Sequence, residues 1–122
     1  MTSQILSKAF FGKNNCLKAY LNDKLDFYIE FGKMQDEKTW SWKKVKMNDD
    51  ELGELLNVLE GKKNTINFFH DFKGDKTQIW TSMKDKFFFI KVKEVNKSLN
   101  EGEQRVLLEL LRYSILRMNM KL

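Results

Sequence analysis

The segment WSWKKVKMNDDELGELLNVLEGKKNTINFFHD, residues 40–71, carries the clearest secondary-structure signals in the chain. Residues 40–47 and 65–71 combine aromatic and β-branched side chains, which favour strands. Residues 48–60 between them have the apolar spacing of an amphipathic helix. We therefore predict strand, helix and strand, and we expect this helix to connect two sheets of one small domain.

The helix in this segment has defined ends. Asn48 can accept a hydrogen bond from a free backbone amide, and Glu51 stands at the reciprocal position of a capping box. Gly61 is a typical C-terminal stop. The apolar positions fall at i, i+3, i+4 and i+7 and form one stripe, made of Leu52, Leu55, Leu56 and Leu59.

Short alternating segments separated by Gly, Asn and Asp turns fill the rest of the chain. We predict four strands before the helix, at residues 4–11, 17–21, 25–31 and 38–47, and three or four after it, at 64–72, 77–83, 86–93 and 95–99. A second helix is predicted at 100–118. The expected fold class is α+β, with two antiparallel sheets in a single domain spanning residues 1–122.

Composition limits the function. The 122 residues carry a net charge of +5, with 19 Lys against three Arg. Lysines are point charges that suit phosphate in general, although an AT-rich genome would produce the same excess. No apolar run is long enough for a membrane span, and the N-terminus resembles neither a signal nor a transit peptide. We expect a soluble intracellular protein, in an organelle only if a leader was removed.

Residues for catalysis or metal binding are scarce. The chain has one Cys and one His, too few for a zinc site made by protein ligands alone. His70 and Asp71 are adjacent in a predicted strand, so their side chains point to opposite faces and form no dyad. We expect no enzyme activity and no cofactor, and a structural hydrogen bond for His70.

Aromatic side chains and lysines alternate on the predicted outward faces of the strands. Single-stranded nucleic acid needs both, because bases stack on flat rings and lysines neutralise phosphates. Asp26 and Glu30 oppose this role on the third strand. The alternative is a two-sided core or subunit interface, in which Trp42 and Phe87 are buried. The predicted contact residues are Lys8, Phe10, Lys18, Tyr20, Trp40, Trp42, Lys44, Trp80, Phe89 and Lys91.

The second helix is apolar over a wider arc than one sheet requires. The extra flank indicates a partner subunit, and deep burial in the same domain is the alternative. The predicted oligomer contacts are Leu107, Leu111, Ile115 and Met118.

Several motifs together resemble the Whirly family of single-stranded DNA-binding proteins. They are Trp40-Ser41-Trp42 followed by lysines, a helix beginning near Glu51-Leu52-Gly53, Phe68-Phe69-His70-Asp71 before Lys73-Gly74, the strand of residues 87–92, and a C-terminal helix at 103–115. The resemblance implies a homotetramer assembled through the helices, with DNA along the sheet edges. The related kinetoplastid guide-RNA-binding proteins share this architecture, so RNA stays open.

The leading hypothesis is sequence-independent binding of single-stranded DNA, which would protect or organise it in replication, repair or transcription. One alternative is an RNA-binding or annealing factor. Another is a structural or protein-interaction module that binds no nucleic acid. Comparing DNA with RNA of matched sequence separates the first two.

Overall fold

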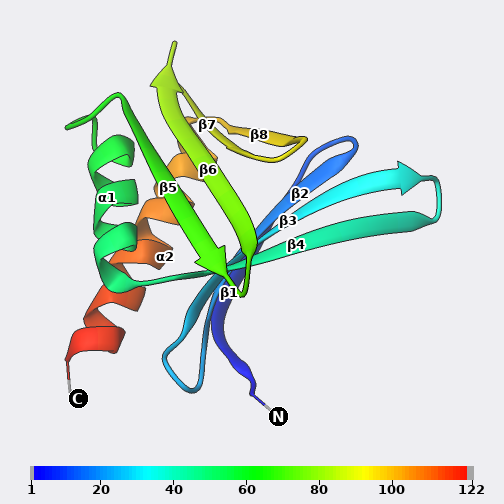
Figure 1. Ribbon diagram of the computed structural model, residues 1–122. Helices are drawn as coiled ribbons and strands as arrows, with labels where there is room; N and C mark the ends of the chain where they lie inside the picture. The colour runs from blue at the N-terminus through cyan, green and yellow to red at the C-terminus, as the bar shows by residue number, and fades with distance from the viewer. Residues whose placement is uncertain (1, 121–122) are drawn as a thin grey trace.

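The computed structural model describes residues 2–120, and its element order agrees with the predicted α+β architecture (Figure 1). The elements are β1 (Gln4–Phe11), β2 (Asn15–Asn22), β3 (Phe27–Asp36), β4 (Thr39–Met47), α1 (Asp49–Leu59), β5 (Thr65–Phe72), β6 (Asp75–Lys84), β7 (Phe87–Val92), β8 (Val95–Leu99) and α2 (Glu101–Asn119). Residues 1, 121 and 122, the ends of the predicted domain, lie outside the described part.

The strands form two antiparallel sheets, each in the order of the sequence: β1-β2-β3-β4 in the first sheet and β5-β6-β7-β8 in the second. The segment that contains α1 connects them, as predicted (Figure 1). Its capping box is present, because Asn48 Oδ1 accepts from the Glu51 amide at 2.8 Å and Glu51 Oε1 accepts from the Asn48 amide at 3.0 Å. Asn100 and Glu103 make the same pair of bonds at the start of α2.

The bounds of several strands differ from the prediction, and those of β3 differ most. β3 begins at Phe27 because Leu25 has a φ of 63°, a left-handed conformation that belongs to the preceding turn. At its other end, β3 continues through Gly32 to Asp36, where a loop was expected. The extended pairing with β4 makes a long hairpin, which projects from the body of the molecule in Figure 1.

One hydrophobic core joins both sheets and both helices. The first sheet contributes side chains such as Leu17, Ile29 and Val45, and the second contributes Ile79 and Phe88. We call the faces that carry these residues the inner faces, and the opposite faces the outer faces. From the helices the core takes Leu52, Leu55, Val58, Leu107, Leu110 and Leu111.

The structure corrects two of the contact residues predicted on α2. Leu107 and Leu111 were expected to contact a partner subunit, but Leu111 has no exposed surface, Leu107 is buried, and both pack in the core of their own chain. Ile115 and Met118 are half-buried against the same core. The sequence shows apolar positions on both flanks, and only packing decides which flank is covered. The exposed apolar side chains of α2 are Val106, Tyr113 and Leu116, followed by Met120.

His70 has the structural role that the sequence predicted. Its Nε2 lies 2.6 Å from Glu51 Oε2, which ties β5 to the first turn of α1. Asp71, the residue after His70, pairs with Lys76 on the neighbouring strand. Its side chain lies on the opposite face of the sheet from His70. The alternation continues through the motif, since Phe68 is buried and Phe69 is exposed.

Candidate nucleic-acid interface

The outer face of the first sheet brings together aromatic rings and lysines from β2, β3 and β4. On β4, Trp40, Trp42, Lys44 and Lys46 stand opposite Met34, Gly32, Glu30 and Tyr28 of β3. Residues directly opposite in an antiparallel pair project to the same side. The pairing between β2 and β3 adds Lys18 and Tyr20 to that side. The predicted grouping of Lys18, Tyr20, Trp40, Trp42 and Lys44 is therefore one surface.

Trp42 is held flat by its neighbours on this face. A Cβ at Gly32 would stand only 2.5 Å from Trp42 Cζ3, so the indole rests directly on the glycine backbone. Lys18 Nζ lies 4.2 Å from the centre of the indole, within cation–π range. Trp40 stacks alongside at 5.7 Å with an interplanar angle of 19°. Trp42 is 41% exposed, which leaves ring surface for a ligand and excludes the buried alternative in the single chain.

Two tyrosines extend the platform and fix Lys44. Tyr20 and Tyr28 stack at 5.6 Å, and Lys44 Nζ lies 4.2 Å from the Tyr28 ring. Tyr20 is only 7% exposed, so its ring supports the surface and cannot stack on a base in the single chain. Burial raises the pKa of the Tyr20 hydroxyl. A hydrogen bond with Tyr20 raises the pKa of Lys44 above its usual 10.5, so Lys44 keeps its charge at neutral pH.

The carboxylates that opposed a nucleic-acid role are matched by lysines. Asp26 Oδ1 lies 3.2 Å from Lys46 Nζ. Glu30 pairs across the sheet with Lys18 on one side and with Lys44 on the other. The described part of this face thus carries three lysines against two carboxylates, and the cations stand beside the exposed rings. A phosphate bound on this face would contact lysines that already lie beside the carboxylates of Asp26 and Glu30.

The outer face of the second sheet holds the other predicted residues. Trp80, 41% exposed, pairs across the sheet with Lys91, whose Nζ lies 5.9 Å from the indole centre. Phe89 is half-buried, and its ring centre lies 6.4 Å from that of the exposed Phe87. Phe69 on β5 is 62% exposed and points to the same side, opposite Gln78.

Phe69 was absent from the sequence-based list of contacts, and Phe87 was considered only as an outward or core residue. The signal for both was the alternation of side chains along a strand. In FFHD, a buried Phe68 turns Phe69 outward, and in FFFIKV a buried Phe88 turns Phe87 and Phe89 outward. Phe88 is fully buried, which places Phe87 and Phe89 outside.

Lys8 and Phe10 were placed on the wrong face. In the register of β1 and β2, Lys8 stands opposite Ala19 and Phe10 opposite Leu17, on the inner face. Phe10 is 3% exposed and belongs to the core, so it offers no ring to a base. Lys8 is exposed at the sheet edge with its Nζ 5.8 Å from the Phe10 ring. Apolar residues occur at both odd and even positions of β1, so the sequence allowed either orientation.

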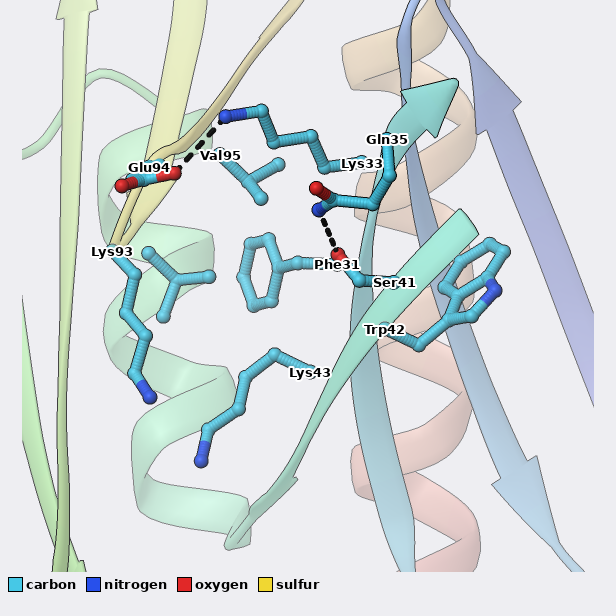
Figure 2. Close-up of a pocket in the computed structure, with 10 residues that line it drawn as sticks. Phe31, Lys33, Gln35, Ser41, Trp42, Lys43, Lys93, Glu94 and Val95 are labelled. Atoms are coloured by element: carbon cyan, nitrogen blue, oxygen red, sulfur yellow. Dashed lines mark hydrogen bonds and ion pairs between the residues drawn. The ribbon is translucent and has the colours of Figure 1, made fainter. Parts of the chain in front are cut away.

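A cleft of about 300 Å³ lies between the β3–β4 hairpin and the β7–β8 turn, on the inner side of β4 (Figure 2). In Figure 2, Lys43 points into it while Trp42 points away on the other side of the strand. Lys33 Nζ bonds to Glu94 at 3.0 Å, and Lys43 bonds to Asp75. The Asn15 side chain also donates to the Asn96 carbonyl at 2.8 Å. These contacts pin the two sheets together, so Lys33 and Lys43 act mainly in the fold.

Metal-ligand clusters and membrane-spanning helices are both absent from residues 2–120. Residues 2–120 hold no group of three or more His, Cys, Asp or Glu side chains arranged for a metal ion. In the same part of the chain, neither helix is both long and apolar enough to cross a membrane.

The fold is similar to that of a chain in the crystal structures of Trypanosoma brucei MRP1/MRP2. The TM-score is 0.59 and the sequence identity 13%, and the match covers 92% of this chain and 83% of that chain. At this identity the likeness shows a shared fold. No protein-family model matches the sequence, and no curated protein sequence shows significant similarity to it. The two-sheet architecture is thus shown by the structure, and the Whirly resemblance stays a prediction at the level of sequence.

Proposed function

We propose that this protein binds single-stranded DNA without reading its sequence, through the outer face of the first sheet. The observation that carries the proposal is the exposed Trp42 indole, stacked beside the half-buried Trp40 and bordered by Lys18 and Lys44. An unpaired base can stack on the open indole surface, with a gain of about 1–3 kcal/mol for any base. The neighbouring ammonium groups neutralise the phosphates that connect successive bases.

Several features favour single strands over duplex. Proteins that read duplex DNA commonly place a helix in the major groove. The first turn of α1 carries Asp49, Asp50 and Glu51 and its last turn has no basic residue. On α2, Arg105 is engaged with Glu109 at 3.0 Å. The platform also uses lysines, which lack the planar fork that makes Arg suited to bidentate base recognition.

The shared fold and the Whirly resemblance support the same ligand class, with RNA as the alternative to DNA. In the cell, binding of this kind would protect or organise exposed strands during replication, repair or transcription. We propose a binding role for this chain and no catalytic one. Competition between oligo-dT and oligo-U of equal length tests the preference for DNA, since only RNA presents 2′-hydroxyls.

We further propose the homotetramer that the resemblance implies, with the outward side of α2 as its contact surface. Val106, Tyr113, Leu116 and Met120 are exposed there, and their burial against a copy would remove apolar area from water. Light scattering on Leu116→Asp tests this surface. A variant that keeps the wild-type mass would exclude Leu116 from the interface.

Fluorescence titration with oligo-dT tests the binding site. We expect tryptophan quenching at low salt, an affinity that falls steeply with salt, and weaker binding to duplex of the same length. Trp42→Ala should weaken binding by about 1–3 kcal/mol, and Trp42→Phe should recover part of this because it retains a ring.

A pair of lysine variants provides a matched control. Lys44→Ala should lower the affinity and reduce the salt slope by about one phosphate contact. Lys62→Ala removes the same charge from the exposed turn after α1 and should leave both quantities close to wild type. Equal effects of the two variants would show that only net charge matters, and would refute the site. Equal affinity for duplex and single strand would refute the ligand class.

A further inference from the structure

The contact residues predicted from the sequence lie on two separate surfaces in the structure. Trp40, Trp42 and Lys44 lie on the outer face of the first sheet, while Trp80 and Lys91 lie on the outer face of the second. The inner faces of both sheets share one core, so each outer face points away from that core. Figure 1 shows the second sheet and the β3–β4 hairpin diverging from the common centre.

We infer that the outer face of the second sheet is a separate binding site for single-stranded nucleic acid, so that each chain holds two strand segments at once. This inference rests on the proposed function. The second face repeats the combination found on the first, a tryptophan with a lysine over its ring. Lys91 Nζ lies 5.9 Å from the Trp80 ring, compared with 4.2 Å for Lys18 and Trp42.

The second face has room for more than one base. Phe69 stands on β5, Trp80 on β6, and Phe87 and Phe89 on β7, so exposed or half-buried rings occupy three adjacent strands. Adjacent strands lie about 4.8 Å apart. The rings are also offset along the strands, since Phe69 stands opposite Gln78 and Phe89 opposite Ser82, so they offer several stacking surfaces on a diagonal across the sheet. Between them, Asn67 and Gln78 present amide groups that can donate to or accept from base edges.

The charge of this face fits a polyanion and disfavours a basic partner. The outward positions of β6 and β7 are Lys76, Gln78, Trp80, Ser82, Lys84, Phe87, Phe89 and Lys91, as the strand register shows. These eight described positions hold three lysines and no carboxylate, and β5 adds one carboxylate to the same face, Asp71 opposite Lys76. The outer face of the first sheet carries two carboxylates, Glu30 and Asp26. Rings flanked by cations match bases joined by phosphates.

Stoichiometry of short oligo-dT binding tests the second site. An oligonucleotide of about eight nucleotides lies within the range that one small single-strand-binding module covers. Tight-binding titrations count the oligonucleotides bound per chain in the wild type, in Trp42→Ala/Lys44→Ala on the first face, and in Trp80→Ala/Lys91→Ala on the second. We expect two per chain in the wild type, one in each double variant, and none when both sets are combined.

The remaining site in each double variant should keep its affinity within about twofold, because the two faces share no outward residue. If Trp80→Ala/Lys91→Ala fails to fold by circular dichroism, Lys84→Ala/Lys91→Ala replaces it, since it changes only exposed lysines. Trp80→Phe, which retains a ring, should restore the second oligonucleotide.

Distinct outcomes separate this inference from the proposed function. Saturation of the wild type at one oligonucleotide per chain, with loss of binding only in the first-face variant, overturns the second site and leaves the proposed function standing. Loss of all binding in either double variant shows one continuous site and also overturns the inference. An unchanged titration in the first-face variant refutes the proposed function instead. A second-face variant with altered mass by light scattering and unaltered stoichiometry identifies a protein interface, which overturns the second site.

Discussion

Gly32→Ala should remove the binding platform without removing the fold. Gly32 faces Trp42 across β3 and β4, and an added Cβ would stand 2.5, 2.7 and 2.8 Å from three atoms of the indole. Ordinary contacts begin at 3.4 Å, so the ring must move by about 0.9 Å, the difference between 3.4 and 2.5 Å. Trp42 is 41% exposed, so the ring can shift toward solvent.

The displacement costs little stability. It weakens the contact of the indole with Lys18, worth about 0.5–1 kcal/mol at an exposed site, and its stack on Trp40, worth about 0.5–1.5 kcal/mol. Replacing a strand glycine with alanine returns about 0.5–1 kcal/mol of backbone entropy. The free energy of unfolding should therefore fall by at most about 2 kcal/mol. Affinity for oligo-dT should fall by the value of one stacked base, about 1–3 kcal/mol, or about 5- to 150-fold in Kd.

Urea unfolding and fluorescence titration measure the two quantities on the same sample. Gly53→Ala on α1 is the matched control, because a Cβ there meets no atom within 4 Å. It should raise stability by up to about 1 kcal/mol, as expected for alanine in a helix, and leave affinity unchanged. A folded Gly32→Ala protein with wild-type affinity would refute the role of the Trp42 platform.

Three further outcomes are expected. Leu111→Asp should abolish folding, because it buries a charge in the core, and the cooperative urea transition should be lost. Leu116→Asp should fold and change only the mass measured by light scattering. His70→Ala should lower the free energy of unfolding by about 1–3 kcal/mol through loss of its bond to α1, and Asp71→Ala, exposed next to it, should have little effect. A hydrogen bond from its lysine partner holds the pKa of Asp75 below 3.8, so this pair stabilises the fold above that pH and the benefit is lost as pH falls through the lowered pKa. Asp75→Asn should therefore unfold at lower urea than wild type at neutral pH, with the two midpoints converging in strong acid; equal midpoints at neutral pH would contradict the pinning role.

Local signals predicted the elements well. The capping boxes at Asn48 and Asn100 involve residues three apart, and the hydrogen bonds they promise appear at both helices. The alternation of β4 placed Trp40, Trp42 and Lys44 on one face, as the register confirms. These features depend on neighbours in the sequence, so short-range rules were sufficient.

The sequence could not decide which of two equally apolar faces of an element is buried. β1 has apolar residues at both odd and even positions, and its pairing with β2 places Phe10 on the inner face. The width of the apolar arc on α2 was visible, but contacts with both sheets decided that Leu107 and Leu111 are covered by their own chain. The depth of Tyr20 also depends on neighbours from other strands, Tyr28 and Lys44.

The sequence by itself therefore determined the order of strands and helices, the capped connection between two sheets, and the alternation of rings and lysines along each strand. Only the tertiary structure decided which rings share a surface. Alternation fixes which side chains of a strand share a face. The relative placement of the two sheets depends on the core that both help to form. Packing around that core places Trp42 and Trp80 on two separate outer faces.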